Sequence, residues 1–128
     1  MHLMTRSIPA GSKACLAALL LILAAGPRPA AAHAILMESV PAVNATAKGP
    51  DIAFDLRFNS RIDKKRSRLT LTLPDQSQQV LPIDADGADD KLDTKASLPA
   101  GAYTLRWQVL AIDGHITRGD VPFTVGGN

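Results

Sequence analysis

The sequence predicts a small all-β protein, an antiparallel sandwich of about seven strands, and three observations lead to this fold class. Apolar and polar residues alternate with a period of two in several short segments, as they do in strands with one buried face. Turn-forming residues separate these segments, and no amphipathic helix of useful length is predicted after residue 32. The chain has 128 residues, which suits one domain and is short for two.

The clearest strands lie in the middle and at the end of the chain. Residues 51–58 and 68–73 alternate between apolar and polar side chains. Residues 103–109 form the strongest pattern, and residues 121–125 follow as the last strand. The core is expected to contain Phe54, Leu56, Leu71, Leu105 and Trp107.

Three weaker segments complete the sandwich. Residues 80–83 include Pro82, which lacks the N–H that a central strand needs and therefore indicates an edge strand. Residues 91–98 are a further candidate, and residues 35–39 are assigned to the first strand. This number of short strands favours a Greek-key arrangement of immunoglobulin-like shape, although a small open barrel would show the same periodicity.

The first 32 residues have the pattern of a secretory signal, so we expect an exported protein. Arg6 and Lys13 supply positive charge, and residues 14–25 are all apolar, which is too short a run to span a bilayer. Cleavage is expected after Ala32, at the end of an alanine triplet, although cleavage after Ala34 also fits the small-residue rule. The predicted domains are a cleaved signal, residues 1–32, and a β-sandwich, residues 33–128.

Removal of the signal changes the charge and the cysteine content. Residues 33–128 hold 11 basic and 12 acidic residues, so the net charge changes from +2 to −1, which argues against a nucleic-acid binder. Cys15 leaves with the signal, so the exported domain has no thiolate ligand or nucleophile. Any metal must therefore be held by nitrogen and oxygen donors, with Met37 as the only sulfur.

The two histidines of the exported domain, His33 and His115, are the candidate metal ligands. As the first residue, His33 would offer its α-amine and ring Nδ1, which close a six-membered chelate when both are deprotonated. The parity of residues 103–109 continues to Asp113 and His115, so an extended chain would point both side chains to one rim of the sandwich. The alternative is an Asp-Gly hairpin turn that leaves His115 at the surface.

Three nitrogens and one carboxylate oxygen suit Cu(II) best among the divalent ions, although Zn(II) would accept the same donors in a tetrahedral set. Other charged segments have simpler interpretations. The basic run 61–68 is interpreted as a solvated loop, and the acidic run 84–93 does not match a calcium-binding loop. No spacing favours a serine–histidine–acid triad, so no catalytic residue is predicted.

The two ends of the exported domain resemble the CopC family of periplasmic copper-resistance proteins. Residues 33–42 are similar to that family's mature N-terminus, His-Ala-x-Leu followed by Ser-x-Pro-Ala. Asp113-Gly114-His115 and residues 119–125 are similar to its C-terminal signature, and residues 99–107 fit between them. The resemblance therefore spans essentially the whole exported domain.

This resemblance implies one Cu(II) per chain, held by the terminal amine, His33, Asp113 and His115. It implies a non-catalytic role in copper homeostasis or resistance, as a buffer, store or carrier alongside a CopD-type membrane protein. We expect a monomer that binds no nucleic acid. Two departures from the family are Ser60, where many members have a glutamate, and the lack of a methionine-rich Cu(I) segment.

Two other functions remain open. The chelate formed by the amine and ring of a terminal histidine, together with a second histidine, is called a histidine brace. Such a brace on an immunoglobulin-like sandwich also resembles the copper polysaccharide monooxygenases, which are usually larger and need a broad substrate face. Here strand parity turns Tyr103 and Trp107, the only Tyr and Trp, toward the core. The second alternative is a metal-free sandwich that binds protein partners.

Overall fold

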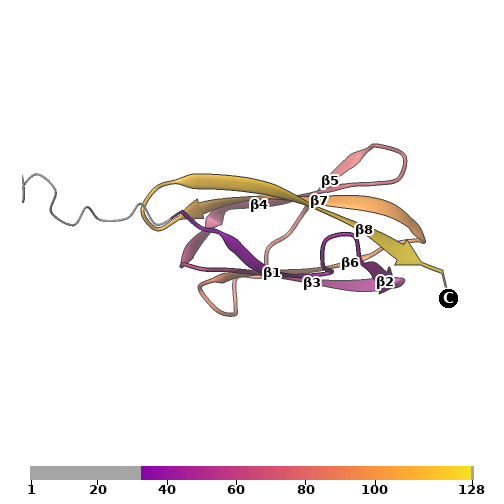
Figure 1. Cartoon of the computed structure of the whole chain (residues 1–128), viewed down its shortest axis with the longest axis horizontal. Coiled ribbons are helices and arrows are strands. Elements are labelled where there is room, and N and C mark those ends of the chain that lie inside the picture. Colours follow the sequence, from indigo (N-terminus) through magenta and orange to yellow (C-terminus); the bar gives the residue numbers. More distant parts are fainter. Residues whose placement is uncertain (1–32, 128) are drawn as a thin grey trace, which may run out of the picture. The chain divides into compact units, whose positions relative to one another are not determined.

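The computed structural model describes residues 33–127, which form two β-sheets packed face to face (Figure 1). The predicted signal, residues 1–32, lies outside the described residues. Residues 33–127 contain no helix long and apolar enough to cross a membrane. The strands are β1 (Leu36–Val40), β2 (Thr46–Lys48), β3 (Asp51–Phe58), β4 (Ile62–Thr72), β5 (Gln78–Leu81), β6 (Lys91–Ser97), β7 (Gly101–Ala111) and β8 (Ile116–Gly126).

The two sheets contain three and five strands. The first has the order β1-β3-β6, and the second has the order β2-β8-β7-β4-β5. Neighbouring strands are antiparallel except for the short β2, which runs parallel to β8. The predicted all-β, immunoglobulin-like sandwich is therefore confirmed, and two separate sheets take the place of the single sheet of a barrel. An edge strand, β5, is present near the predicted segment 80–83, but it spans Gln78–Leu81 and ends before Pro82, so only residues 80 and 81 of that segment belong to it.

The core lies between the sheets and is built by the alternation that the sequence displays. The large apolar side chains of β3 are all buried, and two of them contact aromatic rings of the opposite sheet. The ring centroids of Phe54 and Phe123 are 5.5 Å apart, and those of Phe58 and Trp107 are 5.2 Å apart. All five predicted core residues are buried, Trp107 being the most exposed of them at 7%.

The interpretation of residues 61–68 as a loop is wrong, because β4 already begins at Ile62 and pairs with Ala111 of β7. The register then shifts between Asp63 and Arg68. At this bulge the Asp63 carboxylate accepts the backbone N–H groups of Lys65 and Arg66, at 3.1 and 3.3 Å. An irregular strand of this kind loses its period-two alternation, so the sequence pattern resembled that of a charged loop. The three-residue β2 was also missed, because it is too short to show a period.

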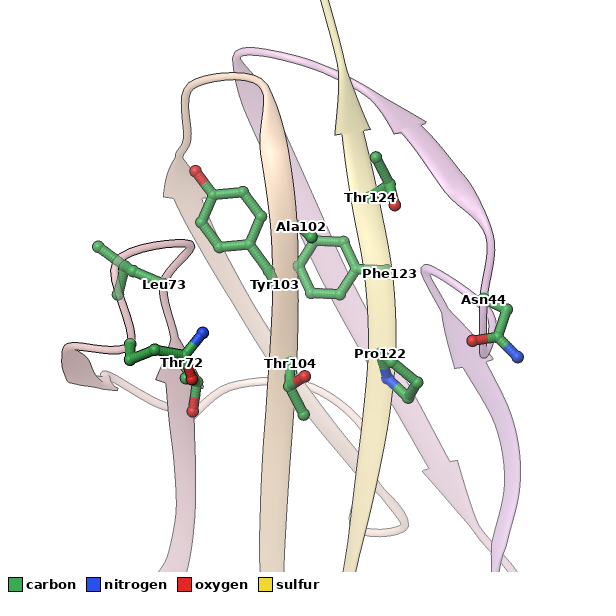
Figure 2. Close-up of a pocket in the computed structure, with 10 residues that line it drawn as sticks. Asn44, Thr72, Leu73, Ala102, Tyr103, Thr104, Pro122, Phe123 and Thr124 are labelled. Atoms are coloured by element: carbon green, nitrogen blue, oxygen red, sulfur yellow. The ribbon is translucent and has the colours of Figure 1, made fainter.

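A hollow of about 300 Å³ lies where β4 and β8 end and β7 begins (Figure 2). Tyr103 and Phe123 stack beside it with ring centroids 5.6 Å apart. None of its lining side chains is charged. This hollow therefore lacks the imidazole and carboxylate groups of the predicted site, which belong to the opposite end of β7 and β8.

Candidate metal centre

The turn between β7 and β8 carries Asp113 and His115, two of the three predicted ligands. β7 ends at Ala111, whose N–H donates to the carbonyl of His115 at 2.8 Å. The N–H of Gly114 donates to the carbonyl of Ala111 at 2.9 Å, and Gly114 has a φ of 90°, a value that favours glycine. The hairpin-turn interpretation of Asp113-Gly114-His115 is therefore correct. The prediction that the strand alternation continues to Asp113 and His115 is wrong, because β7 ends two residues before Asp113.

The turn nevertheless brings the two side chains together. Oδ1 of Asp113 accepts the backbone N–H of His115 at 3.1 Å, and Oδ2 lies 2.9 Å from Nδ1 of the imidazole. The backbone N–H of His115 is the main reason that the pKa of Asp113 lies below its ordinary value, and the two nearby imidazoles act in the same direction. The Asp113 and His115 side chains keep 28% and 51% of their surface exposed, so an ion from solvent can reach them.

His33 reaches the same place from the other end of the described chain. Its ring meets the ring of His115 edge to face, with centroids 4.7 Å apart and planes at 78°. The next residue, Ala34, is 1% exposed, and its carbonyl accepts the hydroxyl of Thr117 at 2.8 Å. The structure therefore brings all three predicted side-chain ligands to one end of the sandwich, although His33 and Asp113 are 80 positions apart in sequence.

As the side chains stand, no three His, Cys, Asp or Glu groups within residues 33–127 are placed to hold a metal ion. The reason is visible in the turn, where both oxygens of Asp113 contact His115. A metal ion must compete with this contact for the same carboxylate and imidazole. The identity of the ligands therefore stays a prediction.

The loop between β3 and β4 borders the candidate site and contains residues that the sequence did not single out. Asn59 donates its N–H to the carbonyl of Ile35 at 3.0 Å and accepts the N–H of Ile35 on its own Oδ1 at 2.7 Å. The hydroxyl oxygen of Ser60 is buried without a hydrogen-bond partner among the described residues, so it is not displayed at the surface as a further ligand. No motif marks Asn59 or Thr117, because their role depends on contacts between distant segments.

A two-sheet, immunoglobulin-like sandwich with two imidazoles and a carboxylate at one end defines a class of small β-proteins with a candidate metal site. Comparison with known proteins makes this class specific. A family model described as the CopC domain matches residues 36–126, and the chain belongs to the CopC family. The resemblance that the sequence motifs indicated is therefore confirmed. Protein YobA of Escherichia coli K12 is 33% identical over 98 residues, which cover 73% of this chain and 79% of YobA.

Two solved structures share the fold. CopC from Methylosinus trichosporium OB3b has a TM-score of 0.67 at 21% identity and covers 75% of this chain and 96% of its own. PcoC from Escherichia coli, described as a methionine-rich copper resistance protein, has a TM-score of 0.60 at 30% identity. That comparison covers 74% of this chain and all of the PcoC chain. The strand arrangement of the sandwich is thus the one found in these copper-related relatives.

Proposed function

We propose that this protein is an exported, non-catalytic Cu(II)-binding protein that buffers, stores or delivers copper in the periplasm. One Cu(II) is held by His33, Asp113 and His115, with the α-amine of His33 as a fourth donor after cleavage behind Ala32. The observation that carries the proposal is the contact between the rings of His33 and His115, with centroids 4.7 Å apart. Packing of the core does not require two polar, exposed imidazoles from distant segments to meet.

The donor set favours Cu(II) over other ions. Imidazole, amine and carboxylate groups are borderline to hard donors, and Cu(II) forms the most stable complexes with them in the divalent series. Cu(I) prefers thioether or thiolate sulfur. PcoC is described as methionine rich, whereas residues 33–128 of this chain contain only Met37. This contrast supports a site for the oxidised ion.

A carrier role is supported over an oxidative enzyme by the placement of the aromatic residues. Tyr103 and Trp107 are 3% and 7% exposed, so neither offers a surface platform for a polymeric substrate. Their inward orientation agrees with the strand parity of the sequence. An anionic Asp113 in contact with the ion would also favour Cu(II) over Cu(I), which opposes a redox cycle.

Delivery needs a surface on which a recipient can dock, and the site has an apolar border. Ile112 and Ile116 flank the turn and are 64% and 54% exposed, while Ile35, close to His33, is 56% exposed. Exposed aliphatic side chains grouped in this way are typical of contact surfaces for other proteins. We propose that the protein acts as a monomer and transfers copper to a CopD-type membrane protein through this border.

The intact mass of the exported protein, measured with and without Cu(II), tests the proposal. We expect a chain that starts at His33 and gains one copper ion. His115→Ala should lose most of the affinity, and Asp113→Ala should lose less, because imidazole is the better donor. A matched control is Asp75→Ala, since Asp75 also accepts the N–H of the residue two positions later, Ser77, but in the β4–β5 turn.

Three outcomes would count against the proposal. A mature chain starting at Ile35 would lack His33 altogether and exclude the amine–imidazole chelate. Unchanged copper binding in His115→Ala would place the ion elsewhere. Loss of binding in Asp75→Ala would mean that the measured effects arise from the fold rather than from ligands.

A further inference from the structure

We propose that Asn59 and Thr117 are positioning residues that fix the backbone next to His33 and so hold its imidazole against His115. The link to metal affinity rests on the proposed function, whereas the positioning itself concerns the metal-free protein. Neither residue supplies a metal donor in this proposal. Each acts on the peptide groups of Ala34 and Ile35, which connect His33 to β1.

Asn59 holds Ile35 from the three-stranded sheet. The pairing of β1 with β3 ends at Leu36 and Phe58, and Asn59 is the next residue along the chain. Its backbone N–H donates to the carbonyl of Ile35 at 3.0 Å, and its Oδ1 accepts the N–H of Ile35 at 2.7 Å. Both polar groups of the Ile35 backbone are thus satisfied by one residue. The side-chain amide replaces the carbonyl that a further residue of β3 would have provided.

Thr117 holds Ala34 from the five-stranded sheet. Its Oγ1 donates to the carbonyl of Ala34 at 2.8 Å, across 83 positions of sequence. Thr117 lies on β8, where it pairs with Val109 of β7. The Ala34 side chain is buried, at 1% exposure, and belongs to the core cluster. The consecutive residues Ala34 and Ile35 are therefore anchored to the five-stranded and the three-stranded sheet, respectively. Two anchors on different sheets restrict rotation of the chain next to His33.

The anchors lie very close to the ligands in sequence. One peptide bond separates Ala34 from His33, and Thr117 follows His115 by two residues on the same turn and strand. Only a short stretch of chain joins each imidazole to the Thr117–Ala34 hydrogen bond. This hydrogen bond therefore largely sets the distance between the two imidazoles. Without the anchors His33 would be a freely moving terminal residue after cleavage. An ion would then have to order the segment as it binds, which weakens affinity.

Paired substitutions at Thr117 provide the test, in protein produced from the full-length chain and recovered after export. Thr117→Val keeps the shape of the side chain but removes the donor, whereas Thr117→Ser keeps the donor. We expect the nuclear Overhauser contacts between the His33 and His115 rings in copper-free protein to disappear in the valine variant and persist in the serine variant. Cu(II) affinity, measured by chelator competition, should fall about tenfold in the valine variant alone, in line with one lost hydrogen bond.

Two further variants keep the test decisive. Asn59→Leu removes the side-chain acceptor at an exposed position and should also release the His33 ring while leaving the core intact. Thr124→Val is the matched control, because Thr124 is exposed near the other end of β8 and should leave ring contacts and affinity unchanged.

The outcomes separate the two proposals. Persistence of the His33–His115 ring contacts in both Thr117→Val and Asn59→Leu would overturn the positioning role. The unsubstituted protein could bind no Cu(II) while Thr117→Val and Asn59→Leu still lose the ring contacts. That result would uphold the positioning role and overturn the proposed function. Loss of contacts in Thr117→Ser but not in Thr117→Val would show that side-chain volume, not the hydrogen bond, holds the segment.

Discussion

At the residue scale, Gly114 decides how the two candidate ligands of the β7–β8 turn meet. Its φ of 90° belongs to the region that non-glycine residues rarely adopt. A Cβ atom added there would meet no heavy atom within 4 Å, so the requirement for glycine comes from the backbone and not from crowding. The residue between Asp113 and His115 therefore has a conformational role that a spacing motif alone does not express.

Gly114→Ala should lower both stability and metal affinity. The strained backbone is expected to cost about 1 kcal/mol of unfolding free energy, measured by chemical denaturation of the metal-free protein. A turn that relaxes to avoid the strain separates Asp113 from His115, so Cu(II) affinity should also fall. Gly127→Ala is the control, since Gly127 has open space around it and no positive φ is recorded for it. Wild-type affinity in Gly114→Ala would show that the turn conformation does not set the ligand geometry.

The residue scale is also where sequence reasoning about the site was most uneven. His33, Asp113 and His115 were identified correctly as neighbours, because ligand chemistry limits the choice of residue types. The mechanism of their convergence was wrong, since a period-two argument cannot detect that β7 ends at Ala111. Asn59 and Thr117 were not predicted at all, because a hydrogen bond across 83 positions leaves no local pattern.

At the scale of strands, the pair β3–β6 contains an unfavourable contact. Asp55 and Asp93 are directly opposite each other in the antiparallel register. Burial, followed by the charge of Asp55, raises the pKa of Asp93 above its ordinary value, and Lys91 and Lys64 only partly offset this effect. Like charges in directly opposed positions destabilise a strand pair by a few tenths to about 1 kcal/mol.

Asp93→Asn should therefore stabilise the protein at neutral pH. The pKa of Asp93 is higher in the folded than in the unfolded state, so its ionisation costs stability as pH rises through the two pKa values. The unfolding temperature of the variant should exceed that of the wild type at pH 7. The difference should shrink as pH falls through the raised folded pKa and be largely lost below about 4, where the unfolded carboxylate is also protonated. Asp51→Asn, opposite the neutral Ser97, is the control. A destabilised Asp93→Asn variant at pH 7 would contradict the repulsion.

The strands themselves were predicted where their alternation is unbroken. β3 matches the predicted bounds fully, and β7 extends the predicted segment by two residues at each end. Gly119 shows what alternation cannot reveal: a Cβ there would lie 2.4 Å from the Trp107 ring, its partner on β7. That glycine makes room for an indole, a requirement set by a cross-strand neighbour.

At the scale of the whole molecule, the candidate site joins the two sheets. His33 precedes β1 of the three-stranded sheet, and the turn with Asp113 and His115 joins two strands of the five-stranded sheet. A bound ion would therefore link the two sheets at this end of the sandwich. Binding to the folded state alone stabilises it, by about 2.7 kcal/mol when free metal is a hundredfold above its Kd.

Cu(II) should thus raise the unfolding temperature at pH 7, by roughly 10–20 °C for a domain of this size at that saturation. The increase should be much smaller at pH 5, because protons compete for free amines and imidazoles, whose ordinary pKa values are about 8 and 6.5. Asp113 does not contribute to this loss, since the His115 N–H holds its pKa below the ordinary value and it stays ionised. Thermal unfolding by circular dichroism at both pH values measures the effect. An equal increase at both would point to carboxylate ligands only.

The lengths of β7 and β8 have a practical consequence for attaching the protein to other objects. β8 runs 11 residues from the turn with the candidate ligands to Gly126, a span of about 35 Å, and it ends at the opposite end of the sandwich (Figure 1). An electrode linker, a fluorophore or a resin coupled after Gly126 would leave the candidate copper site facing outward in every molecule. The same cargo coupled ahead of His33 would occupy the amine that we propose as a ligand. The sandwich thus has one end at which a label can be attached and one end that must stay unmodified.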